Sequence, residues 1–100
     1  MTKSDITNTL KGLEKYGFKV YTFNSNKPMP TGLKGLPDHL IIGKSYQWWI
    51  EVKLGKDTEK PDQKIFREMI ERFEAKNKVV RYRQVNENNL AEVVSEIYGK

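Results

Sequence analysis

The fold of this chain is decided by the stretch Gly35-Leu36-Pro37-Asp38-His39-Leu40-Ile41-Ile42, which continues through Gly43-Lys44-Ser45 into Tyr46-Gln47-Trp48-Trp49-Ile50-Glu51-Val52-Lys53. Two apolar runs rich in β-branched and aromatic residues flank a Gly-Lys-Ser turn, a pattern that predicts a β-hairpin. If Lys44 and Ser45 form its two-residue loop, Asp38 lies directly opposite Glu51. Because side chains alternate along a strand, Lys53 shares the face of Glu51. The hairpin therefore gathers two carboxylates and a lysine.

This grouping of charges indicates a metal site. Like charges directly opposite each other destabilise a sheet, so the pairing of Asp38 with Glu51 needs a reason. A divalent cation supplies the simplest one, because carboxylate oxygens are ligands that Mg²⁺ and Mn²⁺ prefer. Lys53 is then placed to hold an attacking water, to help deprotonate it, or to offset charge on a phosphate. The alternative is that Glu51 and Lys53 form a solvated pair on an exposed strand, as an isolated Glu-x-Lys triplet usually does.

Gly35-Leu36-Pro37-Asp38 followed by Ile50-Glu51-Val52-Lys53 resembles the signature of the PD-(D/E)xK nuclease superfamily. Within it, the chain is most similar to the small stand-alone virus-type replication-repair nuclease (VRR-NUC) domains of phages and prophages, over nearly its whole length. The resemblance implies one α/β domain over residues 1–100, with a restriction-endonuclease-like α-β-β-β-α-β core and a C-terminal helix, in which helices flank a mixed sheet. It also implies a metal-dependent DNA endonuclease of the replication and repair type.

The resemblance assigns roles to the residues of the site. Asp38, Glu51 and the backbone carbonyl of Val52 would hold Mg²⁺ or Mn²⁺. Lys53 would position the attacking water or stabilise the phosphate. Gln63, which falls on the inward face near the start of a predicted helix, would lie beside Lys53 and hold it in place.

An acidic residue on the first helix often completes the metal site in this family. The local Ser-Asp-Ile around Asp5 resembles the family's Ser-Glu-Ile, so Asp5 is favoured over Glu14 as this ligand. Aspartate is shorter than glutamate by one methylene, and a residue so close to a helix start also suits a capping or helix-dipole role. Both roles for Asp5 stay open.

The composition fits a nucleic-acid-binding domain. The 100 residues suffice for one domain, and 18 Lys and Arg against 13 Asp and Glu give a net charge of +5, which favours a polyanionic partner. The absence of cysteine excludes disulfides, cysteine zinc sites and thiol nucleophiles, and it fits a reducing cytoplasm. No run is apolar enough for a signal peptide or membrane span. Gly43-Lys44-Ser45 is a turn without a preceding glycine-rich run, so we expect no nucleotide cofactor.

Other elements follow from hydrophobic spacing and end signals. A first helix with the apolar stripe Ile6, Leu10 and Leu13 is expected to be capped by Ser4 and ended by Gly17, and a strand spans residues 18–23. A second helix begins at Pro61, and a further strand covers residues 79–85. The second helix is expected to bury Phe66, Met69, Ile70 and Phe73. Asn86 or Asn88 caps a last helix with the stripe Leu90, Val93, Val94 and Ile97.

Several features bear on DNA binding. Lys27 and Lys34 lie in a long irregular segment that leads into the site, and Arg81 and Arg83 share one strand face. Each set would either contact DNA phosphates or remain solvated. A nuclease of this size has little surface for gripping duplex or branched DNA, and stand-alone members of the family tend to dimerise, so we expect a symmetric homodimer. The alternatives are a non-catalytic DNA-binding module on a nuclease fold, and an interaction domain, which would leave Asp38, Glu51 and Lys53 unexplained.

Overall fold

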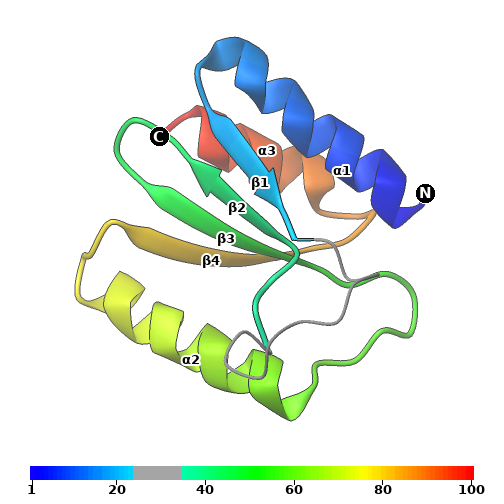
Figure 1. Cartoon of the computed structure of the whole chain (residues 1–100), viewed down its shortest axis with the longest axis vertical. Coiled ribbons are helices and arrows are strands. Elements are labelled where there is room, and N and C mark those ends of the chain that lie inside the picture. The colour runs from blue at the N-terminus through cyan, green and yellow to red at the C-terminus, as the bar shows by residue number, and fades with distance from the viewer. Residues whose placement is uncertain (24–34) are drawn as a thin grey trace.

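Four strands form one mixed sheet in the order β1-β2-β3-β4 in a computed structural model that describes residues 1–23 and 35–100 (Figure 1). The elements are α1 (Lys3–Lys11), η1 (Gly12–Tyr16), β1 (Lys19–Thr22), β2 (His39–Ile42), β3 (Gln47–Val52), α2 (Pro61–Ala75), β4 (Val80–Val85) and α3 (Leu90–Tyr98). β1, β2 and β3 pair antiparallel, whereas β4 runs parallel to β3 because α2 forms the crossover between them. The predicted single α/β domain with a mixed sheet and three α-helices is confirmed.

The β2–β3 hairpin has the predicted register. His39 pairs with Ile50 and Ile42 pairs with Gln47, and the Gly43 N–H donates to the Tyr46 carbonyl oxygen at 2.9 Å. This pairing leaves Lys44 and Ser45 at the tip of the hairpin. One step beyond the paired residues of β2, it places Asp38 opposite Glu51.

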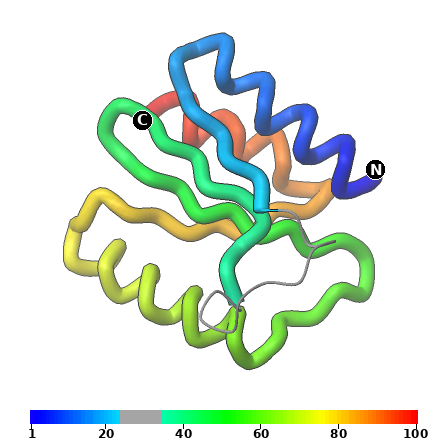
Figure 2. Tube along the Cα trace, viewed as in Figure 1, coloured from blue at the N-terminus to red at the C-terminus, as the bar shows by residue number. Residues whose placement is uncertain are grey.

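The main core lies between the sheet and the layer formed by α1 and α3, whereas α2 covers the other face (Figures 1 and 2). Strand alternation sends Trp48, Ile50 and Val52 into this core, together with side chains of both helices. The buried apolar set is Ile6, Leu10, Leu13, Val20, Ile41, Trp48, Ile50, Val52, Val85, Leu90, Val93 and Ile97. Among the residues that the structure describes, no helix has both the length and the apolar content to cross a membrane.

The prediction that Ser4 caps the first helix is wrong, because α1 begins one residue before Ser4. Thr2 is the N-cap, and its hydroxyl accepts a hydrogen bond from the Asp5 N–H at 3.2 Å. In return the Asp5 carboxylate accepts from the Thr2 N–H at 2.8 Å, which completes a capping box. This reciprocal pair satisfies two backbone N–H groups at the start of the helix. The α-helix ends at Lys11, and Gly17 follows the 3-10 turn η1 with a φ of 93°.

The predicted cap of the last helix is also displaced. Asn89, and not Asn86 or Asn88, occupies the N-cap position of α3. The side-chain oxygen of Asn86 accepts hydrogen bonds from the N–H groups of Asn88 and Asn89 at 2.8 and 3.0 Å. Asn86 therefore forms the turn that precedes the helix, a role that asparagine fills as readily as capping.

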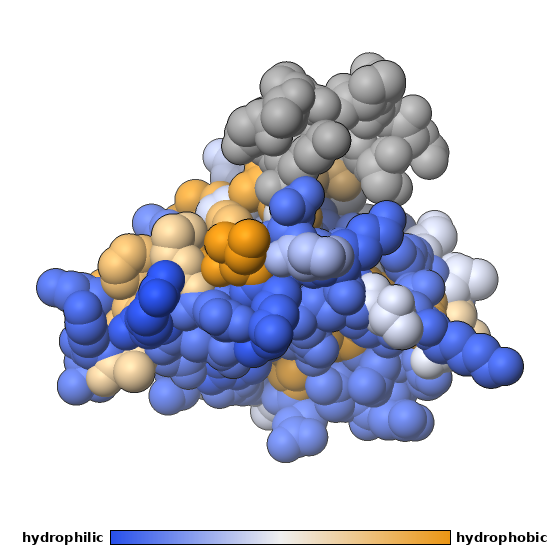
Figure 3. Space-filling view, turned by 90° about the horizontal axis from the view of Figure 1, so that it is seen from below, coloured by the Kyte–Doolittle hydropathy of each residue, from blue (hydrophilic) through white to orange (hydrophobic). Residues whose placement is uncertain are grey.

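The prediction that α2 buries Met69 and Phe73 is wrong. These side chains are 38% and 41% exposed, whereas Ile70 is buried and Phe66 packs edge-on against Trp49 with ring centroids 5.0 Å apart. α2 packs mainly against β4, the edge strand of the sheet, so none of the described strands lies beneath the outer part of its apolar stripe. Figure 3 shows the molecule from below relative to Figure 1, and on this face apolar residues interrupt a largely hydrophilic surface.

The glycine of the Gly-x-Pro-Asp motif has a steric reason. Gly35 has a φ of 89°, and a Cβ at this position would lie 2.6 Å from the backbone carbonyl oxygen of Asp62 in the first turn of α2. Only glycine combines this backbone conformation with so close an approach. The motif thus holds the segment that carries Asp38 against the start of α2.

We expect Gly35→Ala to lower the free energy of unfolding by about 1–3 kcal/mol, because it adds both backbone strain and overlap with Asp62. Urea unfolding followed by circular dichroism measures the change. Gly12→Ala is the matched control, since Gly12 has helical angles and an added Cβ would meet nothing within 4 Å. Equal stabilities of the two variants would contradict the close approach of Gly35 to α2.

Candidate functional site

Asp38 and Glu51 meet at the end of the hairpin opposite its tip. Asp38 directly precedes β2, and its Oδ2 accepts a hydrogen bond from the Val52 N–H at 2.8 Å. Glu51 lies in β3 between two core residues, so alternation turns its side chain toward the α2 face, where it is only 3% exposed. The two carboxyl groups lie close enough for Asp38 to act on the ionisation of Glu51.

The environment of Glu51 opposes its negative charge. Burial is the largest cause that raises the pKa of Glu51, and the charge and side-chain hydrogen bonding of Asp38 act in the same direction, so that the pKa is about 8. The positive charges of Lys53 and Lys3 oppose this shift without cancelling it. The pair therefore holds a proton near neutral pH unless further positive charge is supplied.

Lys53 is held beside this pair by the start of α2. Its ammonium group donates to the side-chain oxygen of Gln63 at 2.8 Å and to the Thr58 carbonyl at 3.1 Å, and it lies 3.9 Å from Glu51 Oε1. The Lys53 side chain is 17% exposed. Gln63 also accepts the Lys60 N–H at 3.0 Å, so one amide oxygen both caps α2 and orients the lysine. The contact between Lys53 and Gln63 that the resemblance implies is present.

The structure does not bring Asp5 or Glu14 to the carboxylate pair. Two hydrogen bonds from Thr2 occupy the Asp5 carboxylate and lower its pKa. The Glu14 carboxylate accepts the Val20 N–H at 3.3 Å and lies 3.6 Å from the Lys19 ammonium. Within residues 1–23 and 35–100, no three His, Cys, Asp or Glu side chains come together to hold a metal.

A small hollow of about 270 Å³ adjoins Asp38 on the α1 side. It is lined by Lys3, Thr7, Thr22, Phe23, Asp38, His39 and Val52. Sequence reasoning missed Lys3 and Thr7, although their spacing of four residues places them on one face of α1 and was the signal available. The first helix thus presents a cation and a hydroxyl beside Asp38.

His39 is a buried structural residue. It is 2% exposed, with Thr22 Oγ1 3.1 Å from Nδ1 and Thr7 Oγ1 3.5 Å from Nε2. Burial lowers its pKa, which favours the neutral ring. Its side chain points to the α1 face, away from Glu51, as strand alternation predicts.

The two arginines of β4 are engaged within the chain. Arg83 donates to both oxygens of Glu96 at 2.8 and 2.9 Å and to Glu74 at 2.9 Å, so it joins α3 to α2. The Arg81 guanidinium lies 4.4 Å from the centroid of the Tyr46 ring, and its Nε is 4.0 Å from Glu74. Lys27 and Lys34 lie outside the described residues.

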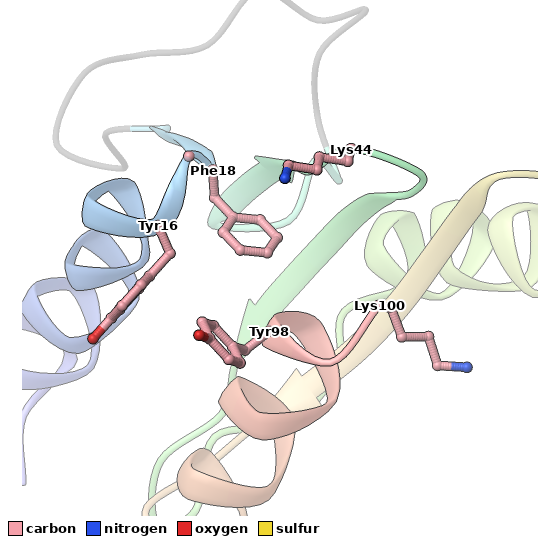
Figure 4. Close-up of a pocket in the computed structure, with 6 residues that line it drawn as sticks. Tyr16, Phe18, Lys44, Tyr98 and Lys100 are labelled. Atoms are coloured by element: carbon pink, nitrogen blue, oxygen red, sulfur yellow. The ribbon is translucent and has the colours of Figure 1, made fainter.

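A second hollow, of about 310 Å³, lies near the tip of the hairpin (Figure 4). Tyr16, Phe18 and Tyr98 surround it, and the rings of Tyr16 and Tyr98 meet edge to face at 5.0 Å. None of its described lining residues is acidic. It lies at the opposite end of β2 and β3 from Asp38 and Glu51, so it is separate from the carboxylate site.

The donor chemistry of the carboxylate site fits a divalent cation. Mg²⁺ typically takes one or two protein carboxylates and fills its remaining positions with water and substrate phosphate oxygens. Asp38 and Glu51 supply such a pair, and a bound cation would stabilise the negative charge of Glu51 that its surroundings disfavour.

No family model matches the chain, and it has no match among the curated proteins or the solved structures.

In metal-free buffer, we expect the free energy of unfolding to fall as the pH rises from about 5 to about 8. The folded chain keeps the Glu51 proton up to a pKa of about 8, whereas the unfolded chain releases it near 4.5. Between these values the unfolded state binds fewer protons, so rising pH favours unfolding. Glu51→Gln cannot ionise, and it should flatten this decline and exceed the wild type in stability at about pH 8. Urea unfolding in EDTA at several pH values measures both.

A parallel decline in wild type and Glu51→Gln would contradict this assignment. Glu68→Gln is a suitable control, because the Glu68 side chain is 51% exposed and its ion pair is with Lys64 on the same helix. It should retain the wild-type decline.

Proposed function

We propose that this chain is a Mg²⁺- or Mn²⁺-dependent DNA endonuclease of the VRR-NUC type within the PD-(D/E)xK superfamily. The observation that carries the proposal is the placement of Asp38 opposite buried Glu51, with Lys53 held beside them by Gln63. The order α1-β1-β2-β3-α2-β4, with β4 parallel to β3, supports a restriction-endonuclease-like core. The net charge of +5 supports a polyanionic substrate.

In the proposed reaction, Asp38, Glu51 and the Val52 carbonyl would hold the cation, which would supply a lowered pKa of bound water and positive charge to offset that of the phosphate. Glu51 would have to give up its proton to act as a ligand, because its pKa of about 8 keeps it protonated near neutral pH. The Val52 N–H fixes one oxygen of Asp38. Lys53 positions the attacking water or stabilises the phosphate, and Gln63 fixes the direction of its ammonium group.

Cleavage of labelled duplex, nicked-plasmid and four-way-junction DNA, with Mg²⁺, Mn²⁺ or EDTA, tests this function. We expect cutting only with a metal. Asp38→Ala, Glu51→Ala and Lys53→Ala should each reduce the cleavage rate about 10²-fold or more, because the first two remove a metal ligand and the third removes the positioned lysine. Asp5→Asn should keep most of the activity and lose up to about 1 kcal/mol of stability, since its carboxylate caps α1.

The same assay separates the nuclease from a DNA-binding module. If no metal supports cutting and Glu51→Ala binds DNA as well as the wild type does, the chain is a binding module and the proposed function fails. Full activity in any one of the three variants would overturn the role of that residue. Loss of activity in Asp5→Asn would restore Asp5 as a ligand.

We also propose that the nuclease is a homodimer that joins two copies through α2. Met69 and Phe73 are apolar and partly exposed on this helix, and Ile65 is 69% exposed. Light scattering after size exclusion should give twice the chain mass, and Met69→Lys with Phe73→Lys should give a folded monomer. Tyr98→Lys is the control, because Tyr98 is exposed on α3 on the other side of the sheet. A wild-type monomer would overturn the dimer.

A further inference from the structure

The connection between β3 and α2 folds back over Lys53. Asp57 and Leu54 close a turn, in which the Asp57 N–H donates to the Leu54 carbonyl at 3.0 Å and the Asp57 carboxylate accepts the Leu54 N–H at 3.2 Å. The turn brings the Thr58 carbonyl to the Lys53 ammonium. Lys53 therefore has one acceptor in this connection and a second, Gln63, in α2. Its position depends on where residues 54–60 are held.

Glu59, the next residue after Thr58, is held from two other elements. Its carboxylate accepts two hydrogen bonds from Arg67 of α2, from Nε at 2.7 Å and from Nη2 at 3.0 Å. Gln84 of β4 donates to the same carboxylate at 3.3 Å. The Arg67 and Glu59 side chains are only 26% and 22% exposed. A two-point, charge-assisted contact between half-buried groups fixes geometry better than an exposed ion pair does.

The far end of this contact returns to the site. Gln84 lies beside Glu51 in the parallel pairing of β3 and β4. Because Gln84 also donates to Glu59, β4 fixes the position of Glu59 relative to the Glu51 carboxylate. The contacts form a closed path from Glu51 to Lys53 and Thr58, then through Glu59 to Gln84, and back to Glu51 across the sheet. Arg67 ties this path to α2. We call Arg67, Glu59 and Gln84 the loop bracket.

We propose that the loop bracket positions Lys53 for the chemistry of the site, with Arg67 and Glu59 acting through the Thr58 carbonyl. This inference rests on the proposed nuclease function and names further residues that serve it. Arg67 and Glu59 are positioning residues, because their contacts are with the loop and not with the carboxylate pair. A lysine side chain has high rotamer freedom, so a fixed acceptor on each side of its ammonium group is what confines it. Small misplacements of catalytic groups reduce rates steeply.

The first test measures Lys53 without using catalysis. A lysine-acylating reagent is applied to the folded protein, and mass spectrometry gives the labelling rate of each lysine. We expect Arg67→Ala and Glu59→Gln to raise the rate at Lys53 about tenfold, because its ammonium group is released from Thr58. Lys19, an exposed lysine on β1, is the internal reference and should not change.

The second test measures cleavage in the same variants with Mg²⁺. We expect kcat to fall about tenfold, equal to about 1.4 kcal/mol, while KM for DNA stays within about twofold. The double variant Arg67→Ala with Glu59→Gln should be no slower than either single variant, since both act through one contact. Arg67→Lys should recover part of the rate. Glu71→Gln is the matched control, because it removes the other Arg67 partner, at 2.7 Å on the same helix, and leaves the bracket.

The outcomes separate this inference from the proposed function. Unchanged Lys53 labelling in both Arg67→Ala and Glu59→Gln overturns the bracket, whatever the cleavage results. Faster labelling with an unchanged kcat also overturns it, because Lys53 would then not need to be held. Faster labelling in a protein whose wild type cuts no DNA supports the bracket as a restraint on Lys53 and overturns the nuclease. Faster labelling with a lower kcat supports both.

Discussion

The placement of Asp38 opposite Glu51 is the constraint on which the rest of this structure depends. It brings two acids together across a hairpin and buries one of them, an arrangement that burial and mutual repulsion both oppose, as the raised pKa of Glu51 records. Several features serve to maintain it. The hairpin register sets the pair opposite each other, the Val52 N–H holds Asp38, and Gly35 lets the preceding segment pass close to α2. Two apolar side chains at these positions would stabilise the fold better than two acids do, so stability does not explain the pair.

The two faces of the sheet divide stability from chemistry. Trp48, Ile50 and Val52 point into the apolar core beneath α1 and α3, and Glu51, between Ile50 and Val52 in sequence, points to the opposite face. Among the described helices, α2 is the one that covers that face, and it buries Ile70 and leaves Met69 and Phe73 partly exposed. Because the apolar core on the first face holds the sheet, the α2 face can carry the buried acid, its lysine and their hydrogen-bonding partners. Strand alternation makes this division possible with a single short strand.

Local rules predicted much of this structure and failed where distant contacts decide. The hairpin, its register and the face shared by Glu51 and Lys53 follow from alternation and from a two-residue turn, and all are present. The start of α2 at Pro61 was predicted correctly, whereas the caps of the first and last helices were misplaced, because Thr2 competes with Ser4, and Asn89 with Asn86, for the same capping role. The apolar stripe of α2 did not show how much of the helix the sheet would cover, so the exposure of Met69 and Phe73 could not be predicted from it. The sequence holds many charged and polar residues that could pair with Glu59. Its pairing with Arg67 and Gln84 depends on the path of the loop between β3 and α2, which local rules do not predict.

The composition gives the net charge but does not show which positive side chains are paired with glutamates inside the fold. Arg67, Arg81 and Arg83 each lie against glutamates of other elements, so their charge joins helices, loop and sheet. The positive charge left for a polyanion then comes mainly from lysines, which are compact charges on flexible stems without the planar fork that reads base edges. Lysines suit contacts to phosphates, which fix position on DNA and carry no sequence information. For the proposed nuclease, this division favours recognition of the DNA backbone and its shape over recognition of a base sequence, with binding that weakens steeply as salt rises.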